Sequence, residues 1–309
     1  MNKNALIFVA GHNGLVGSAI VRKLEDVGYT NIVTKNRSEL DLMDQMQVRK
    51  FFKTQRPQYV INAAAKVGGI KANMTFPAEF LYENLQIQNN LIWSAKENNI
   101  TKLLFISSAC IYPIDADQPM AEHQAMQGKL ETANEAYAYA KISGMKLCEF
   151  IHDELDLNFL SCVPTNIYGE YADFDSDNLN VIPSLIRRIH EAKINEIKDV
   201  TIWGTGVSRR DFLYVADLAD AIVFLMENYD EKHFLNIGTG QDVSIKELAI
   251  MIKNIVGYNG DLVFDADKPG GVPKRLLDVT KLHDLGWKHK VDLDSGLKRT
   301  YKWFLNQSS

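Results

Sequence analysis

A tyrosine and a lysine lie one helical turn apart in the segment Tyr137-Ala-Tyr-Ala-Lys141, downstream of the serine pair Ser107-Ser108. Residues i and i+4 share one face of a helix, so this spacing lets a phenol and an ammonium act on the same bound molecule. We expect the charge of Lys141 to favour the ionised phenol and lower the pKa of Tyr137, which suits proton exchange with a substrate oxygen near neutral pH. The alternative for the pair alone is packing plus a solvated lysine. In the context below it indicates ketone or alcohol redox chemistry.

A glycine-rich turn near the start of the chain provides that context. The apolar run 5–10 predicts a buried strand, and the periodic segment 15–27 predicts a helix directly after the turn. Glycines there permit a tight bend and the close approach of a pyrophosphate, and the helix N-terminus supplies amide donors. A plain tight turn is the alternative. Together with the tyrosine and lysine, the turn predicts a dinucleotide site at Gly11, His12, Asn13, Gly14, Leu15, Val16 and Gly17.

The segment after the second expected strand bears on which dinucleotide is bound. An acidic residue that binds the ribose 2′-hydroxyl is typical of NAD sites, but the sequence here reads Thr34-Lys35-Asn36-Arg37-Ser38. Arg37, together with Lys35, would attract a 2′-phosphate, which favours NADP over NAD. The alternative is that these are solvated loop charges, with Glu39 nearby.

The elements that must position these residues alternate along the first half of the chain. Strands are predicted at 5–10, 32–34, 59–62, 103–106 and 159–163, and helices at 15–27, at 78–98 and from about residue 137. This order predicts an α/β fold with a Rossmann-like, doubly wound parallel sheet and helices on both faces.

The second half is irregular from 168 to 179. It then resumes with helices at 182–192, 244–256 and 297–305 and strands at 200–203 and 234–237, with Ser244 as an N-cap. We expect an NADP-binding domain at 1–165, completed by segments near 200–235, and a smaller α/β substrate-binding domain at 166–309. No internal repeat or flexible linker separates them, so the second half should pack onto the first.

Composition narrows the class of protein. The 309 residues are 46% hydrophobic and 24% charged, which is ordinary for a soluble globular enzyme. A net charge of −5 argues against a general nucleic-acid or membrane binder, so an anionic ligand must be held by local basic residues. The three cysteines show neither a disulfide framework nor metal-ligand spacing, and the apolar run 5–10 is too short for a signal peptide or anchor. We expect a cytoplasmic protein without a metal.

Six motifs, in order along almost the whole chain, resemble the extended short-chain dehydrogenase/reductases and, within them, the GDP-L-fucose synthases. The segment Asn62-Ala-Ala-Ala-Lys-Val-Gly-Gly-Ile70 is the most specific of them. The others are Ala10-Gly-His-Asn-Gly14, Ser108-Ala-Cys-Ile-Tyr-Pro113, Tyr137 to Lys141, Pro164-Thr-Asn-Ile-Tyr-Gly169 and Leu276-Leu-Asp-Val-Thr280.

This resemblance implies an NADPH-dependent enzyme that takes a GDP-linked 4-keto-6-deoxy sugar, epimerises it at C3 and C5 and reduces its C4 ketone. Ser108 would bind the C4 oxygen, Tyr137 would protonate it, and Lys141 would hold the nicotinamide ribose. Further cofactor contacts are implied at Arg37, Asp41, Leu42, Ala63, Ala64, Ala65, Pro164, Asn166 and Ile167. A homodimer through the helices 78–98 and 137–155 is implied as well.

The same resemblance implies a site for the GDP-sugar in the second half. Arginines bind a diphosphate bidentately, and a tryptophan can pack on a base or a sugar. The alternatives are a core position for Trp203 and solvated helix charges for Arg187 and Arg188. The implied substrate contacts are Ser108, Asn180, Arg188, Trp203, Arg210, Lys274 and Asp278.

Three positions depart from the family pattern. Epimerisation beside a ketone uses a cysteine, matched here by Cys110, and a histidine, but Asn180 stands where that histidine is expected before Val-Ile-Pro. An asparagine amide cannot act as an acid or base near neutral pH. His190, about 15 Å further along a continuous helix, is a poor substitute. Asn13 replaces an arginine expected beside the 2′-phosphate, and Ser107-Ser-Ala109 replaces Gly-Ser-Ser.

The leading hypothesis is therefore a reductase of the C4 ketone of a GDP-4-keto-6-deoxy hexose or heptose, with little or no 3,5-epimerase activity. One alternative is a full GDP-L-fucose synthase in which Cys110 and water manage both proton exchanges. A second is a nucleotide-sugar 4-epimerase or 4,6-dehydratase that recycles a bound NAD, against which Lys35 and Arg37 argue. A third is a non-catalytic dinucleotide-binding module.

Overall fold

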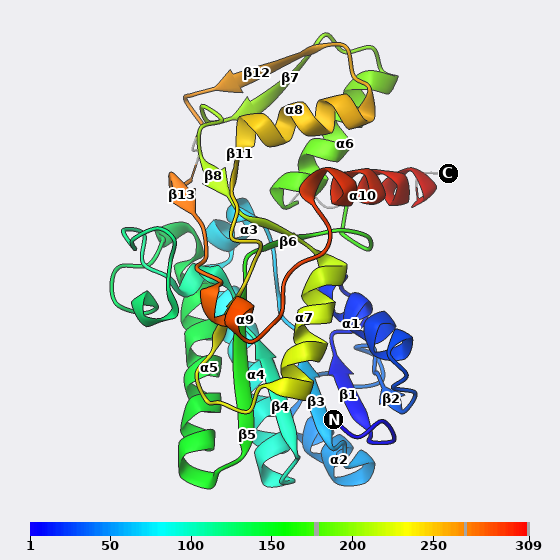
Figure 1. Ribbon diagram of the computed structural model, residues 1–309, viewed down its shortest axis with the longest axis vertical. Helices are drawn as coiled ribbons and strands as arrows, with labels where there is room; N and C mark the ends of the chain where they lie inside the picture. Colours follow the sequence, from blue (N-terminus) through cyan, green and yellow to red (C-terminus); the bar gives the residue numbers. More distant parts are fainter. Residues whose placement is uncertain (176–178, 269–270, 308–309) are drawn as a thin grey trace.

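The computed structural model describes residues 1–175, 179–268 and 271–307 of the chain, and Figure 1 shows a large sheet at one end and a smaller unit at the other. Within the described residues the large sheet has six strands in the order β10-β5-β4-β3-β1-β2, and every pair in it is parallel. The strands span β1 Ile7–Ala10, β2 Ile32–Val33, β3 Tyr59–Asn62, β4 Lys102–Ile106, β5 Asn158–Pro164 and β10 Leu235–Ile237. The predicted Rossmann-like α/β fold is confirmed.

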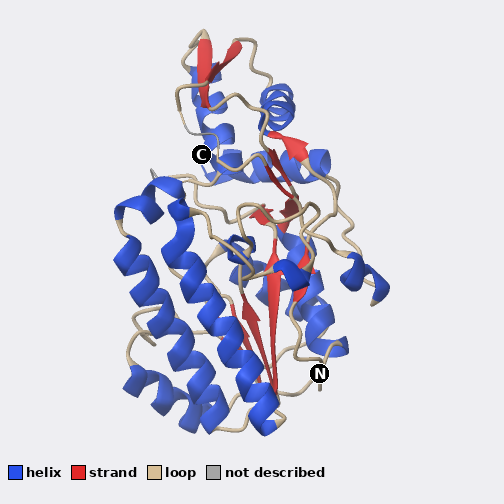
Figure 2. Ribbon diagram, turned by 90° about the vertical axis from the view of Figure 1, so that its left-hand side faces the viewer, coloured by secondary structure: helices blue, strands red, loops and turns tan. Residues whose placement is uncertain are grey.

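Helices cover both faces of this sheet. Successive strand side chains point to opposite faces, and the side chains on both faces of the central strands are buried. Phe8 and Phe105 pack in the core beneath one group of helices, whereas Val9 and Leu104 pack beneath the other. The first group is α2 Gln45–Gln55, α4 Pro77–Glu97 and α5 Glu135–Leu155, and the second is α1 Leu15–Asp26 and α7 Val215–Asn228 with the short α9 Thr280–Asp284. The long helices α4 and α5 lie side by side (Figure 2).

The smaller unit has its own core, formed mainly by three helices and two small sheets. Its helices are α6 Val181–Ile194, α8 Ile245–Val256 and α10 Leu293–Gln307. Its strands are β7 Asp199–Trp203 paired with β12 Asp261–Asp265, and β8 Arg209–Arg210 between β11 Val243–Ser244 and β13 Lys274–Arg275. Between the units lie the pair β6 Asn166–Tyr168 and β9 Phe212–Tyr214, and the helix α3 Ile70–Thr75.

Most predicted elements are present with shifted ends. The first strand begins at Ile7 rather than Ala5, and the last helix begins at Leu293 rather than Leu297. Ser244 caps α8 as predicted, since its hydroxyl accepts from Glu247 N while the Glu247 carboxylate accepts from Ser244 N. The segment 168–179 contains the end of β6 and then no helix or strand up to 175. Its residues 176–178 lie outside the described part.

Several elements had not been predicted. The helices α2, α3, α7 and α9 are among them, as are the short strands β6, β8, β9, β11, β12 and β13. In α7 so many positions are buried, from Val215 to Met226, that a helical period of apolar and polar residues is hard to see. The division into domains at 1–165 and 166–309 stays a prediction. Among the described residues, no helix combines the length and apolar character needed to cross a membrane.

Candidate active site

The turn between β1 and α1 is closely packed at two glycines. Gly11 has a φ of +83°, and a Cβ there would lie 2.8 Å from backbone atoms of Ala63 and Ala64. A Cβ on Gly17 would overlap the carbonyl of Gly11, so neither position accepts a side chain without moving backbone. Gly14 is the N-cap of α1 and makes no side-chain cap, so the amides of the first turn of α1 remain available to an anion.

Two buried polar groups face the same edge of the sheet from the ends of neighbouring strands. Asn62 Nδ2, at the end of β3, and Ser107 Oγ, just after β4, have no hydrogen-bond partner among the described residues. Buried polar groups are nearly always paired, so these two indicate that a polar ligand binds here. Together with the glycine turn, they fit a dinucleotide across the carboxyl ends of the strands.

The other predicted cofactor residues lie at the ends of these strands or in the segments that follow them. Ala65 follows β3, Pro164 ends β5, and Asn166 and Ile167 lie in β6. The Leu42 carbonyl accepts from Asn90 of α4, and Asp41 accepts from Met43 N. His12 and Asn13 lie in the turn itself, and Leu15 and Val16 begin α1.

The two predicted 2′-phosphate contacts differ in their availability. Lys35 Nζ is 2.9 Å from Glu39 Oε1, so its charge is already paired. The Arg37 side chain is 76% exposed, and its Nε lies 4.0 Å from Asp41 Oδ1. Arg37 is therefore the freer of the two cations to meet a 2′-phosphate.

The predicted catalytic residues come together although they lie on separate elements. Lys141 is buried in α5, and its Nζ donates to the Ile106 carbonyl at the end of β4, at 2.9 Å. The same Nζ lies 5.6 Å from the centre of the Tyr137 ring. Ser108 is the N-cap of the short 3₁₀ turn Ala109–Ile111, and Cys110 is buried in that turn. This turn packs against α5, and Tyr137 packs against the core cluster that contains Cys110. A charged Cys110 thiolate would raise the pKa of both Tyr137 and Lys141.

The expected lowering of the Tyr137 pKa is wrong for the chain by itself. Burial raises the pKa of this phenol well above its ordinary value, and the nearby Cys110 adds to the rise. Burial also lowers the pKa of Lys141 to about 8. Desolvation disfavours the charged form of each group, and it is the largest influence on both pKa values. Burial likewise raises the pKa of the Cys110 thiol, although a hydrogen bond from Ser108 and the charge of Arg275 oppose this.

The predicted substrate residues in the smaller unit are dispersed over several elements. Arg188 of α6 donates to the Thr201 carbonyl of β7, and Trp203 at the end of β7 is 57% exposed, so it is not a core residue. Arg210 Nη1 donates to the Arg209 carbonyl at 2.8 Å. Burial, followed by the charge of Arg275, lowers the pKa of Arg210.

The remaining three predicted substrate residues already have partners or lie at the surface. Lys274 Nζ pairs with Asp242 at 2.9 Å. The Asp278 carboxylate accepts from Thr280 N at 2.9 Å, and its pKa is lowered by the side-chain hydroxyl of Thr280 first and then by this backbone N–H. Asn180 is the exposed N-cap of α6, and its side chain makes no cap hydrogen bond. His190, predicted to be a poor substitute for a histidine at position 180, is hydrogen-bonded to Tyr301 of α10 at 2.9 Å.

Two residues beside the catalytic turn had no predicted role. Arg275 Nη1 donates to the Ala109 carbonyl, and Arg275 Nη2 pairs with Glu131. Arg275 stood out in the sequence only as a neighbour of Lys274. Had a strand been predicted at 274–275, the side chains of Lys274 and Arg275 would have been expected on opposite faces, with different partners.

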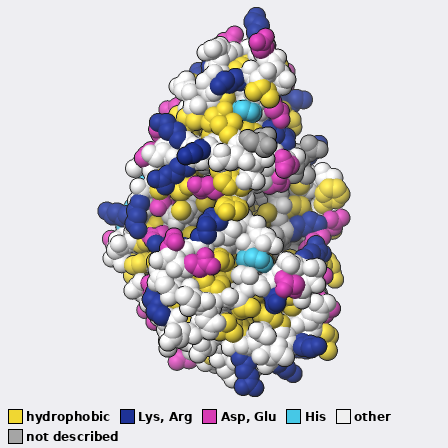
Figure 3. Space-filling view, turned by 90° about the vertical axis from the view of Figure 1, so that its right-hand side faces the viewer, with side chains coloured by type: hydrophobic (Ala, Val, Ile, Leu, Met, Phe, Trp, Pro, Cys, Tyr) yellow, Lys and Arg dark blue, Asp and Glu magenta, His cyan; other side chains and the backbone are white. Residues whose placement is uncertain are grey.

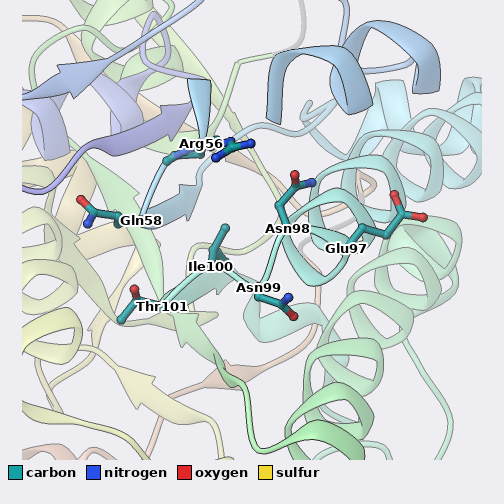
Figure 4. A pocket seen from close by; sticks show the side chains of 8 residues that line it. Arg56, Gln58, Glu97, Asn98, Asn99, Ile100 and Thr101 are labelled. Carbon is teal, nitrogen blue, oxygen red and sulfur yellow. The ribbon is translucent and has the colours of Figure 1, made fainter. Parts of the chain in front are cut away.

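A surface pocket lies at the opposite edge of the sheet (Figure 4). It is lined by the loops before β3 and β4, including Arg56, Gln58, Asn98 and Thr101. These are the amino ends of the strands, away from Tyr137 and Lys141. On the face drawn in Figure 3, basic and acidic side chains are interspersed. Neither feature competes with the carboxyl edge as a site for the predicted chemistry.

Comparisons with known proteins agree with this geometry. Residues 7–238 match the model of the NAD dependent epimerase/dehydratase family. The chain is 52% identical to GDP-L-fucose synthase 1 of Arabidopsis thaliana, over 98% of this chain and 94% of that protein. A GDP-6-OMe-4-keto-L-xylo-heptose reductase from Campylobacter jejuni superposes with a TM-score of 0.95 at 40% identity, covering 99% of each chain. A GDP-mannoheptose C4 reductase from Campylobacter jejuni with NADP bound has a TM-score of 0.90 at 41% identity, also covering 99% of each chain.

Proposed function

Because this chain belongs to the NAD dependent epimerase/dehydratase family and, within it, to the GDP-L-fucose synthase family, we propose that it reduces the C4 ketone of a GDP-4-keto-6-deoxy sugar without inverting C3 and C5. It is an NADPH-dependent oxidoreductase of the GDP-L-fucose synthase type. The observation that carries the finer proposal is a complete group of Ser108, Tyr137 and Lys141 combined with an asparagine at position 180.

The cofactor is NADPH, which supplies the hydride that the ketone carbon receives. The glycine turn and the first-turn amides of α1 would hold its pyrophosphate. Arg37 would meet its 2′-phosphate, and Asn62 and Ser107 would find hydrogen-bond partners on the bound dinucleotide. A Cβ at Gly11 or Gly17 would disturb this cradle, which supports its use for a group that approaches the backbone closely.

The side chains of Ser108 and Tyr137 act on the ketone oxygen. Ser108 donates a hydrogen bond to this oxygen and stabilises the negative charge that develops on it. Tyr137 then gives it a proton. The raised pKa of the phenol suits this direction of reaction, because a reduction needs a tyrosine that still holds its proton at neutral pH. Lys141, with a pKa of about 8, remains mostly protonated near pH 7 and favours the phenolate that remains.

Epimerisation would need two groups that remove and return protons at carbon. Cys110 is present, but burial raises the pKa of its thiol, so little thiolate forms near neutral pH. The amide of Asn180 neither accepts nor donates a proton in this range. Both observations support a reductase that leaves C3 and C5 unchanged.

A full GDP-L-fucose synthase is the second candidate. The 52% identity to a plant GDP-L-fucose synthase and the retention of Cys110 favour it. In that case Cys110 and water would together carry both proton exchanges.

One experiment separates the two candidates. The protein is incubated with GDP-4-keto-6-deoxy hexose and heptose substrates in D₂O, first without and then with NADPH. We expect no enzyme-dependent deuterium at C3 or C5 in the first arm. In the second arm we expect one NADPH consumed per C4 alcohol, with the configurations assigned by NMR. Deuterium at both carbons would favour the full synthase, and product formation without net NADPH consumption would contradict a reductase.

We also propose that the protein forms a homodimer through α4 and α5. These helices leave large apolar side chains exposed, among them Tyr82 at 60%, Tyr139 at 50% and Phe150 at 56%. Sedimentation equilibrium of the wild type and a Tyr82→Glu/Phe150→Glu variant tests this. A monomeric wild type, or an unchanged dimer in the variant, would contradict it.

A further inference from the structure

The guanidinium of Arg275 contacts two segments that carry the proposed catalytic groups. Its Nη1 donates to the Ala109 carbonyl at 3.0 Å, and its Nη2 donates to Glu131 Oε2 at 3.1 Å. The Arg275 side chain is only 11% exposed and that of Glu131 only 17%, so water weakens this pair little. One planar fork, carried by a residue far along the chain, therefore joins the turn after Ser108 to the segment before α5.

The first segment, the turn after Ser108, is held only weakly by the hydrogen bonds within the turn. Cys110 N is 3.5 Å from Ser108 Oγ, and Ile111 N is 3.3 Å from the Ser108 carbonyl. Tyr112 N is 3.3 Å from the Ala109 carbonyl. These distances are longer than the usual N–H···O separation of about 2.9–3.0 Å. The shorter, charge-assisted bond from Arg275 is thus the strongest of these hydrogen bonds in the turn.

The second segment leads directly into α5. Glu131 is the N-cap of the 3₁₀ turn Thr132–Asn134. Asn134 donates to it twice, from its backbone N to the Glu131 carbonyl at 3.0 Å and from Nδ2 to Oε2 at 3.1 Å. Helix α5 begins at the next residue, with Tyr137 in its first turn. Arg275 therefore links the turn of Ser108 to the start of the helix that carries Tyr137.

The register of the small sheet gives Arg275 a third neighbour. Arg275 of β13 is paired with Arg210 of β8, and Lys274 is paired with Arg209. Alternate side chains of a strand point to opposite faces. Arg209 and Lys274 share Asp242, whereas Arg210 and Arg275 repel one another and both interact with Glu131. Arg275 therefore lies between the predicted GDP-sugar contact Arg210 and the catalytic turn.

We propose that Arg275 is a positioning residue that fixes Ser108 relative to Tyr137 and links this geometry to Arg210. The inference rests on the proposed reduction at Ser108 and Tyr137. Both groups must meet one ketone oxygen, and a misplacement of about 1 Å can cost about 100-fold in rate. Arg275 itself donates its hydrogen bonds to protein groups, so its loss should slow the chemical step more than it weakens binding.

The test compares Arg275→Gln and Arg275→Lys with the control Arg209→Gln. Arg209 precedes Arg210 on β8, but it points to the opposite face and pairs with Asp242 and Glu247. For Arg275→Gln we expect kcat for the GDP-4-keto sugar to fall about 10- to 100-fold, with KM and NADPH affinity within about threefold. Arg275→Lys keeps the charge but loses the fork, so its kcat should fall about 3- to 10-fold. Arg209→Gln should retain the wild-type kcat.

Amide hydrogen exchange provides a readout that does not depend on turnover. In Arg275→Gln we expect faster exchange in 109–112 and 132–137 than in the wild type, with unchanged exchange in β1 and α1. If the wild type fails to reduce the substrate, the proposed function fails, and the exchange data still decide whether Arg275 holds the two segments.

Several results would overturn the inference. They are a kcat of Arg275→Gln within about twofold of the wild type, a loss confined to KM, an equal loss in Arg209→Gln, or unchanged exchange in both segments. If Arg275→Gln does not bind NADPH and is unfolded, Arg275→Lys decides. A wild-type kcat in that variant would overturn the role of the fork.

Discussion

Replacing Lys141 by methionine should make the cofactor-free protein more stable near pH 7 while removing its activity. The fall of the Lys141 pKa from 10.5 to about 8 corresponds to roughly 3 kcal/mol of unfavourable burial at about 1.4 kcal/mol per pKa unit. Methionine has a similar length and no charge. The variant leaves the Ile106 carbonyl without its 2.9 Å donor, which costs about 1–2 kcal/mol. The net expectation is a gain of about 1–2 kcal/mol in the free energy of unfolding.

The same shift predicts how this gain depends on pH. Below pH 8 the folded and unfolded chains both hold the Lys141 proton. Between pH 8 and 10.5 only the unfolded chain holds it, so the wild-type free energy of unfolding rises with pH in this window. The advantage of Lys141→Met should therefore shrink as the pH is raised and reverse near pH 10.

Urea unfolding of the cofactor-free wild type and variant at several pH values from 7 to 10 measures both effects. Lys146→Met is the matched control, because Lys146 lies on the same helix but is 40% exposed and paired with Glu149. For this control we expect no gain in the free energy of unfolding at pH 7, because an exposed, paired lysine carries no burial penalty. A Lys141→Met variant less stable than the wild type at pH 7, or a difference from the wild type that stays constant up to pH 10, would refute the reasoning.

Three further variants test the proposed roles. Tyr137→Phe should lower kcat by about 10²- to 10⁴-fold, while the NADPH affinity measured by fluorescence stays within about threefold. Turnover near the wild-type rate would exclude Tyr137 as the proton donor. Arg37→Ala should shift the ratio of kcat/KM for NADPH to kcat/KM for NADH by about 10-fold or more towards NADH. The Tm should not change, because Arg37 is exposed. An unchanged ratio would show that Arg37 does not select the cofactor. In D₂O without NADPH, Asn180→His should introduce enzyme-dependent deuterium at C3 or C5 of the substrate. The double variant with Cys110→Ala should show whether the thiol takes part. No exchange in Asn180→His would mean that position 180 alone does not limit epimerisation.

Local patterns were enough for the elements with clear periodicity and caps. The strand β3 was predicted with its observed bounds, and Ser244 was identified as the N-cap of α8. Both depend on side chains within a few residues of one another. The helix α7 was missed because its burial comes from contacts with α1 and the sheet, which a short window of sequence does not contain.

The candidate site divides in a similar way. The i to i+4 spacing of Tyr137 and Lys141, and the glycines between β1 and α1, are local features that already predict a reductive dinucleotide enzyme. The resemblance of the six motifs, together with Asn180, narrowed that prediction to a GDP-sugar reductase. These parts of the site depend on residue type and spacing along the chain.

The tertiary structure decided the electrostatics and the support of the site. From spacing alone we expect a lowered pKa for Tyr137. In the structure, burial beside α5 removes water from the phenol and so raises its pKa. Sheet register brings Arg275 beside Arg210, and the Arg275 side chain reaches the turn of Ser108. Sequence by itself determined which chemical groups the protein carries. Only the packed fold decided their desolvation and their partners, because both depend on contacts between segments that are distant along the chain.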